Sequence, residues 1–436
     1  MKMAKSLAIA MLAVSAAAGL AAQTASIHGY LDYTNFAVGQ EFQKAGDGDF
    51  IESDAAAEFG SFYNGRTSLD VAVDAQNFHF ETGVCLDASL GTWYGLYNDV
   101  DTSASNADDI DTIFYKGNVR VELLNGQARI MTGKFEDATF GYTLAGYALG
   151  NMPTGYYAQR DFGQHFTAVE FTPYKVDGLG VMVGLPILPV SGNGVNYAAH
   201  NAYPDLLKKF KAGVRYAAPF GVKFVAGYYN EVHLEGTANY SEESLYTEAW
   251  LQADMPNLVP GVALNAGYDF RLREDNDAMH HSFTVSGKFS PVNRMTVALE
   301  DRLVYNGEHY FMVNEIQLFN QLAAAVSYDL GKSFVAGFNT QFMYAQDANG
   351  STVSNGRLAN VYDDNAMVAE WMPFAANVAT GTPGTYIGVY GYPYIQKNFQ
   401  NGYLRTGVEV QYTGFETSTT SSAIGYRVPV AMCFWF

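Results

Sequence analysis

The chain ends in the stretch IGYRVPVAMCFWF, residues 424–436. Every second residue counted back from the end is apolar, namely Phe436, Phe434, Met432, Val430, Val428, Tyr426 and Ile424, whereas the alternate set is mixed and includes Arg427 and Gly425. Apolar residues that recur with period two indicate a β-strand with one apolar face and not a helix. A tilted strand of roughly 9–11 residues crosses a bilayer, so this stretch is long enough to span one.

The other end of the chain carries an export signal. Lys2 and Lys5 precede the apolar run LAIAMLAVSAAAGL, which is followed by small residues around Ala21 and Ala22. A basic start, a short apolar run and a small-residue cleavage site are typical of a secretory signal peptide. We therefore expect residues 1–22 to be a signal peptide and residues 23–436 to form one domain.

The composition is that of an exported protein with an unusual surface. Aromatic residues make up 15% of the chain, with 31 Tyr and 29 Phe, and there are 43 glycines. After the export signal, no segment offers the eighteen consecutive apolar residues that indicate a membrane-spanning helix. Abundant Tyr, Phe and Gly suit strands with one face in lipid and the other in water. A secreted β-helix or sandwich could share this composition, but the terminal strand argues against both.

Period-two alternation recurs along the whole chain. In GVALNAGYDFRL, residues 261–272, one face is apolar, and the other face carries Asn265, Asp269 and Arg271. In GYLRTGVEVQYT, residues 402–413, Arg405 and Glu409 lie opposite another apolar face. Because a charge that faces lipid at mid-depth costs roughly 2–4 kcal/mol, the charged faces are expected to point into a water-filled interior.

Short connections alternate with long polar ones. Tight links such as DAQN (74–77) and DLGK (329–332) alternate with long stretches at 39–60, 91–111, 137–161, 188–208 and 347–383. We predict an all-β transmembrane antiparallel barrel of about eighteen strands, or alternatively sixteen, with both chain ends on one side. The expected strands are 26–38, 61–74, 77–90, 112–124, 127–136, 162–174, 178–187, 209–218, 221–234, 243–255, 261–272, 280–290, 293–305, 318–330, 333–346, 384–396, 402–413 and 424–436.

An export signal, alternating strands throughout and a last strand that ends in an aromatic residue resemble bacterial outer-membrane porins and major outer-membrane proteins. The resemblance covers the mature chain in pattern only. It implies a cell outer membrane location, contact with outer-membrane lipid, and assembly by the barrel-insertion machinery. The assembly signal would comprise Tyr426, Val428, Val430, Met432, Phe434 and Phe436. A homotrimer is compatible with the resemblance, and the sequence leaves trimer and monomer open.

The resemblance also implies roles for one loop and for the inner wall. In general porins, the loop that corresponds to residues 137–161 folds inward and narrows the pore. Here that loop is rich in Gly and Tyr and has few charges. The residues expected to line the pore are Arg66, Asp70, Glu81, Arg120, Glu122, Arg129, Arg215, Asp269, Arg271, Arg405, Glu409 and Arg427. For each of them, a cross-strand ion pair that stabilises the barrel is an equally good interpretation.

The function expected is passive diffusion of ions and small hydrophilic solutes, with a weak cation preference. The formal net charge is −19, and the acidic excess is concentrated in loops 39–60, 91–111 and 137–161, at the outer mouth. Such a mouth enriches counter-ions. The alternative is a major surface protein with a structural or adhesive role.

Other chemistry is not indicated. No nucleophile motif accompanies the eight histidines, so we do not expect an enzyme. Asp99, Asp101, Asp108, Asp109 and Asp111 lack the spacing of a calcium loop, so no metal site is predicted. No cofactor or nucleic-acid partner is expected.

Removal of Phe436, or its replacement by a charged residue, should leave export intact but reduce the yield of inserted barrel. The seven-residue apolar face ends at this ring. The measurement is the heat-resistant folded band in outer-membrane fractions, with Trp435→Ala, on the alternate face, as the control. A normal folded yield from the Phe436 variants would contradict the expectation.

Overall fold

The computed structural model describes residues 24–45, 49–59, 66–85, 114–134, 142–143, 147–148, 159–160, 165–186, 210–234, 243–273, 278–306, 318–348, 353–354, 357–358, 384–416 and 421–435. The expected signal peptide, the loop at 91–111 and Phe436 lie outside these residues. In the ranges described, no helix has the length and hydropathy needed to cross a membrane.

Strands dominate the described chain. One antiparallel sheet of 20 strands contains β1 (Thr24–Ala45), β2 (Ile51–Phe59), β3 (Arg66–Ala75), β4 (Phe78–Cys85), β5 (Phe114–Leu123), β6 (Ala128–Lys134), β9 (His165–Phe171), β10 (Leu179–Pro186), β11 (Lys211–Ala217), β12 (Lys223–Leu234), β13 (Glu243–Val259), β14 (Val262–Arg273), β15 (Ala278–Phe289), β16 (Met295–Asn306), β17 (Leu318–Gly331), β18 (Phe334–Ala348), β21 (Gly384–Phe399), β22 (Gly402–Gly407), β23 (Glu409–Glu416) and β24 (Ser421–Trp435). Short pairs are formed by β7 (Tyr142–Thr143) with β8 (Gln159–Arg160), and by β19 (Val353–Ser354) with β20 (Arg357–Leu358). A short 3-10 turn, η2 (Leu124–Gly126), joins β5 to β6.

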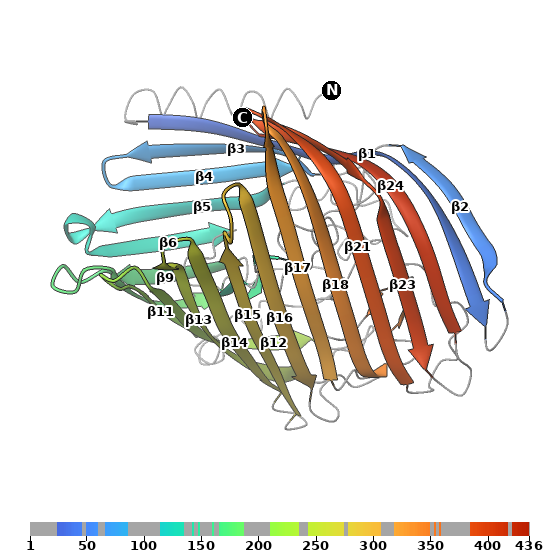
Figure 1. Ribbon diagram of the computed structural model, residues 1–436. Coiled ribbons are helices and arrows are strands. Elements are labelled where there is room, and N and C mark those ends of the chain that lie inside the picture. The colour runs from blue at the N-terminus through green and yellow to red at the C-terminus, as the bar shows by residue number, and fades with distance from the viewer. Residues whose placement is uncertain are drawn as a thin grey trace, which may run out of the picture.

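The sheet closes on itself into a barrel. From β3 to β21, each of the large strands pairs antiparallel with the next large strand in the sequence. Strands β22 and β23 both lie between β21 and β24 and pair antiparallel with each of them. The last strand then pairs with the first, where Tyr30 lies opposite Trp435, and β1 pairs with β3 on its other edge. In Figure 1, β1 and β24 run side by side and complete the circuit. The all-β antiparallel barrel expected from the sequence is therefore confirmed.

The strand count is not confirmed. Two additions bring the sheet to 20 strands. The first is in residues 39–60, expected to be a loop: β1 continues to Ala45, and β2 pairs with it from Phe36 opposite Phe59 to Gln43 opposite Ile51. Polarity alone suggested a loop here, but a polar segment can be a strand when its backbone groups pair with a neighbouring strand.

The second addition arises from a break in one expected strand. Residues 402–413 form two strands, β22 and β23, separated at Val408. The ladder with β21 is interrupted where Pro393 lies, between the pairs Tyr394–Gly407 and Gly391–Val410. Proline has no backbone N–H to donate to a neighbouring strand. The Val408 N–H still donates to the Pro393 carbonyl at 3.1 Å, which holds the broken strand in the wall.

The two faces of the strands differ as the alternation predicts. Along β16, Glu300, Arg302 and Asn306 are buried, whereas Leu303 and Tyr305 between them are exposed. The adjacent histidines of β15 point to opposite faces: His280 is buried, and His281 is hydrogen-bonded on the outside to the Tyr268 hydroxyl at 2.9 Å. Polar groups thus lie inside the barrel and apolar ones outside.

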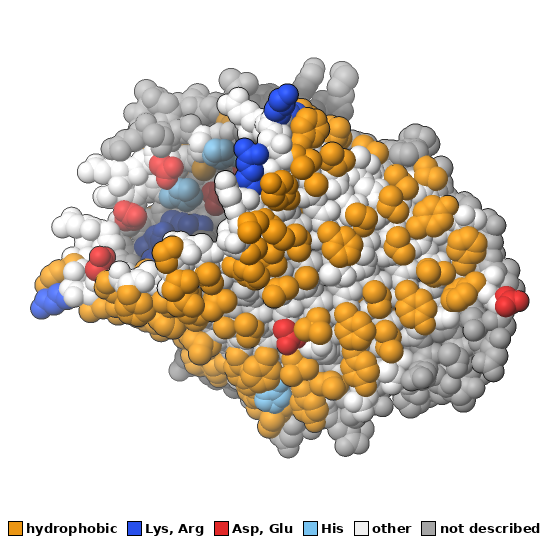
Figure 2. Space-filling view, viewed as in Figure 1, with side chains coloured by type: hydrophobic (Ala, Val, Ile, Leu, Met, Phe, Trp, Pro, Cys, Tyr) orange, Lys and Arg blue, Asp and Glu red, His pale blue; other side chains and the backbone are white. Residues whose placement is uncertain are grey.

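The space-filling view shows this inversion directly. The outer wall in Figure 2 is covered by hydrophobic side chains, and a hollow at its edge gathers Lys, Arg, Asp, Glu and His side chains. The exposed apolar side chains include Phe283, Leu299, Leu303, Leu322, Phe338, Phe342, Val389 and Val410. A soluble protein buries such residues, whereas a barrel in a bilayer turns them toward lipid.

The tight connections and both ends of the described chain lie at one end of the barrel. Thr24, at the start of β1, is opposite Asp74, one residue before the end of β3. At the other terminus, the Trp435 N–H donates to the Asn401 carbonyl, in the β21–β22 turn, at 3.0 Å. The expectation that both termini share the short-turn side is met within the described residues.

Glycines on the inner wall make room for large side chains on neighbouring strands. Gly227 on β12 lies opposite Trp250 on β13, whose ring covers it. A Cβ added to Gly227 would lie 2.0 Å from an indole carbon. The same relation holds between Gly337 and Tyr394, where the nearest ring atom is at 2.2 Å. These glycines are therefore packing sites for aromatic rings.

Gly227→Ala should destabilise the barrel, because displacing a packed ring typically costs about 1–3 kcal/mol. The matched control is Gly117→Ala on β5, where an added Cβ meets no atom within 4 Å. The measurement is the temperature at which the folded band disappears in semi-native electrophoresis. Equal unfolding temperatures for the two variants would show that Trp250 does not depend on this space.

Candidate functional site: the charged inner wall

A buried carboxylate joins two arginines across three strands of the inner wall. Glu170 on β9 is 1% exposed. It accepts hydrogen bonds from Nε of Arg129 on β6 at 2.9 Å and from Arg215 on β11, through Nε at 3.0 Å and Nη2 at 2.7 Å. Arg129 also donates through Nη2. One carboxylate therefore serves two guanidinium groups.

A glycine on the intervening strand permits this cluster. Strand β10 lies between Glu170 and Arg215, and its inward residue opposite Arg215 is Gly180. A Cβ at Gly180 would lie 2.8 Å from Nε of Arg215 and 3.0 Å from Oε1 of Glu170. Any larger side chain would occupy the path of the arginine. Because Gly180 has no side chain, Arg215 can extend over β10 to reach Glu170.

Further round the barrel, other inward charges are paired. Nε of Arg271 lies 3.0 Å from Oε2 of Glu248, its cross-strand neighbour. His280 is hydrogen-bonded through Nδ1 to Oδ1 of Asn306 at 2.5 Å, and its Nε2 is 3.5 Å from Oδ2 of Asp269. All these side chains are nearly or fully buried. Buried charges are stable only when paired and hydrogen-bonded, which explains why they meet across strands.

Two more ion pairs continue the pattern, and one arginine takes another partner. Arg302 donates to Glu300 at 3.1 Å, and Arg427 donates to Glu409 at 2.5 Å. Arg405 instead donates through Nε to Oε1 of Gln396 at 2.7 Å. Its guanidinium also lies over the rings of Tyr394 and Tyr403, at 4.6 and 5.0 Å from the ring centres.

The structure places most of the expected lining residues on inward faces. By strand register, the inward residues are Asp70, Glu81, Arg120, Arg129, Arg215, Asp269, Arg271, Arg405, Glu409 and Arg427. Glu122, opposite Arg129, has the same inward register but is exposed near the β5–β6 turn, and the side chain of Arg66 lies outside the described residues. The cross-strand pairing that the sequence left open holds for Arg271 with Glu248 and for Arg427 with Glu409.

Part of the loop at 137–161 reaches the far wall. The Tyr147 N–H donates to Oγ of Ser286 on β15 at 2.6 Å, and its hydroxyl donates to Oδ1 of Asp254 on β13 at 3.3 Å. Ala148 is fully buried against Ala298, Ala323 and the inward tyrosines of β21. Because β6 and β9 flank this loop on the sequence, these contacts bring it across the barrel interior. Burial and then the Asp254 carboxylate raise the pKa of the Tyr147 hydroxyl above 10.0, so it remains a donor at neutral pH.

Several inward residues were missed from the sequence. Glu170 follows from the alternation in HFTAVEF, where Phe166, Ala168 and Glu170 form the buried set. The inward tyrosines of β21, Tyr386, Tyr390 and Tyr392, are buried as well and were not among the expected lining residues. Among the described residues, no group of three or more His, Cys, Asp or Glu side chains is placed to hold a metal ion.

Comparisons with known proteins give structural likeness without sequence likeness. No protein-family model matches the chain. No curated protein sequence matches it. An anion-selective porin from Comamonas acidovorans has a TM-score of 0.44 and 12% identity, over 94% of this chain and 99% of that one. OpdQ of Pseudomonas aeruginosa has a TM-score of 0.43 and 11% identity, over 94% and 97%. OprD of Pseudomonas aeruginosa has a TM-score of 0.42 and 10% identity, over 95% and 96%.

Glu170→Gln should lower the stability of the barrel by about 1–3 kcal/mol, because two guanidinium groups lose their shared anion. Asp177→Asn, in the exposed β9–β10 turn, is the control for loss of a carboxylate. Urea unfolding in detergent micelles provides the measurement. A Glu170→Gln barrel as stable as Asp177→Asn would show that water replaces the carboxylate without cost.

Proposed function

We propose that the protein is an outer-membrane pore for the passive diffusion of ions and small hydrophilic solutes. The observation that carries the proposal is the inverted distribution of polarity. Charged and amide side chains gather inside a closed sheet, and large apolar side chains cover its outside. Lipid is the solvent that favours such an exterior, and water or a polar solute is what favours the interior.

The same inversion supports the proposed location in the outer membrane. A barrel whose backbone groups pair around a closed circuit can lie in hydrocarbon, and bacterial barrels of this kind occupy the outer membrane. Export by a signal peptide at 1–22 and insertion by the barrel-assembly machinery, directed by the last strand, are part of the proposal. A homotrimer, with lipid at its periphery, stays a prediction that crosslinking in membranes would test.

Ion selectivity is the finer part of the proposal. Inward charges of the described wall lie in ion pairs such as Arg271–Glu248, Arg302–Glu300 and Arg427–Glu409. The wall therefore lends no support to a cation preference. The preference is proposed from three acidic segments alone, the β1–β2 hairpin at 39–60 and the loops at 91–111 and 137–161, which together hold thirteen acidic and two basic residues.

Salt dependence separates the mouth from the wall. Neutralising Asp99, Asp101, Asp108, Asp109 and Asp111 should weaken cation preference at low salt and matter little near 1 M, where the Debye length is about 3 Å. Arg120→Gln, on the inner face of β5, should instead shift selectivity or conductance at both salt concentrations. The measurement is the reversal potential of purified protein in planar bilayers under a salt gradient.

Two outcomes would overturn parts of this proposal. Equal shifts at low and high salt in the loop variant would place those aspartates at the constriction and not at the mouth. Absence of ion current from well-folded protein would reject the pore and leave the alternative, a major surface protein with a structural or adhesive role.

A further inference from the structure

One region of the inner wall carries uncharged hydrogen-bonding groups instead of ion pairs. Its members lie on the inward faces of β17, β18, β21 and β23: Gln321, Asn339, Gln341, Tyr390, Tyr392 and Gln411. We refer to these six residues as the amide–tyrosine patch. Each is buried, with an exposed fraction of 0 or 1%.

Strand register makes the patch continuous. Gln341 lies opposite Tyr390, and Tyr390 lies opposite Gln411, so an amide, a phenol and a second amide follow one another across three strands. Tyr392 lies opposite Asn339 in the next inward row. Cross-strand neighbours on one face have their Cβ atoms about 4.5–5.5 Å apart. Gln321 on β17 is diagonal to Gln341, because its direct neighbours are Arg302 and Met343. The polar groups of the patch therefore lie on one stretch of the inner face.

Three members of the patch present polar atoms without a protein partner. The amide nitrogen and oxygen of Gln321, both amide atoms of Gln411 and the hydroxyl of Tyr392 have no hydrogen-bond partner within the described part of the chain. A buried donor or acceptor that lacks a partner is costly. A bound molecule that forms hydrogen bonds would satisfy these groups. The amide side chains can offer it both donors and acceptors.

The patch is electrically neutral. The charges beside it are themselves paired: Arg302, opposite Gln321, is bonded to Glu300 at 3.1 Å, and Arg427 is bonded to Glu409 at 2.5 Å. The Tyr390 hydroxyl donates to Glu409 at 3.1 Å. The wall at Glu170 differs, because charged side chains meet there directly: two guanidinium groups contact one carboxylate. A charged solute would gain little at the patch and would lose its hydration, so the patch favours an uncharged one.

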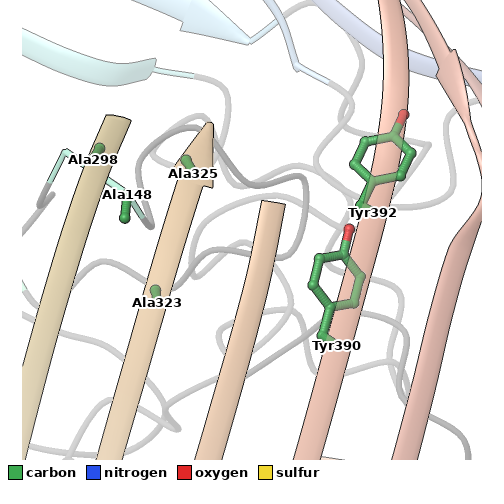
Figure 3. Close-up of a cluster of buried hydrophobic side chains, with 6 residues drawn as sticks. All are labelled: Ala148, Ala298, Ala323, Ala325, Tyr390 and Tyr392. Atoms are coloured by element: carbon green, nitrogen blue, oxygen red, sulfur yellow. The ribbon is translucent and has the colours of Figure 1, made fainter. Parts of the chain in front are cut away.

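Small apolar residues and aromatic rings adjoin the polar groups. Ala298 on β16, Ala323 and Ala325 on β17 and the loop residue Ala148 belong to one buried cluster with Tyr390 and Tyr392 on β21, and β18 lies between the alanines and the tyrosines (Figure 3). The two tyrosine rings stand along β21 with their centres 6.4 Å apart. Apolar floor, ring faces and amide groups together match a molecule that has C–H faces and hydroxyl edges, as sugars do.

We propose that the amide–tyrosine patch is a binding subsite for an uncharged, polyhydroxylated solute of the size of a short oligosaccharide. The inference rests on the proposed pore, because the solute reaches this wall through the lumen. It adds a substrate class to a channel whose other wall is lined by ion pairs.

Maltotriose binding to the purified protein tests the subsite without relying on conduction. Titration calorimetry is performed in a detergent that has no sugar headgroup, on the full-length barrel and on Tyr392→Phe and Gln411→Met. Tyr412→Phe, on the outer face of β23, is the matched control. Loss of one neutral hydrogen bond should weaken binding by about three- to tenfold in each patch variant, and the control should bind like the unaltered protein.

Current block by maltotriose in planar bilayers separates the subsite from the pore. Block that weakens in Tyr392→Phe but not in Tyr412→Phe supports both proposals. If the protein conducts ions but maltotriose neither blocks the current nor binds in calorimetry, the subsite proposal is wrong and the pore proposal is retained. Water would then be the partner of the amide groups of Gln321 and Gln411. Binding without any ion current would reject the pore alone. Equal affinity in Tyr392→Phe, Gln411→Met and Tyr412→Phe, each with a heat-resistant folded band, would place any sugar site elsewhere.

Discussion

The antiparallel hydrogen-bond ladder that closes between β1 and β24 is the interaction on which the rest of the structure depends. In hydrocarbon an unpaired backbone group costs several kcal/mol, so a sheet can lie there only if it has no open edge. The fifteen cross-strand pairs between Tyr30–Ala45 and Ser421–Trp435 remove that edge. Closure also defines an inside and an outside, and every side chain is then assigned to one of them by its parity along the strand.

Parity explains why polar side chains come to be buried in such quantity. Glu300, Arg302 and Asn306 are separated by even numbers of residues, so they all face inward once the register of β16 is fixed. Their stability then depends on what the neighbouring strands present. Arg302 and Glu300 find each other on one strand, whereas Arg271 and Glu248 meet across two. These buried charges on the inner wall are thus compensated by ion pairs with nearby residues.

Glycine on the inner face allows a side chain to extend across a neighbouring strand. Gly180 leaves the space in which Arg215 crosses β10 to Glu170, and Gly227 leaves the space for the ring of Trp250. Where the inner wall has alanine instead, at Ala298, Ala323 and Ala325, the loop residue Ala148 packs against it. Small residues on the inner face therefore position both the charge cluster and the inward loop, and the amide–tyrosine patch lies next to that contact.

The sequence by itself determined the class of fold, the two faces of the strands that it predicted, the sites of the tight turns and the common side of the two chain ends. These features follow from period-two alternation and turn chemistry, which are local properties of the backbone. It also placed Asp269, Arg271, Glu409 and Arg427 on the inner face. Only the tertiary structure showed that β1 continues past its expected end and pairs there with β2, and that the strand beside Pro393 is divided. It also showed that Tyr147 is hydrogen-bonded to Ser286 and Asp254. It alone brought two arginines to Glu170, because that meeting depends on the register of strands distant in sequence and on the space above Gly180. Such contacts are set by closure of the whole sheet, and no local pattern encodes them.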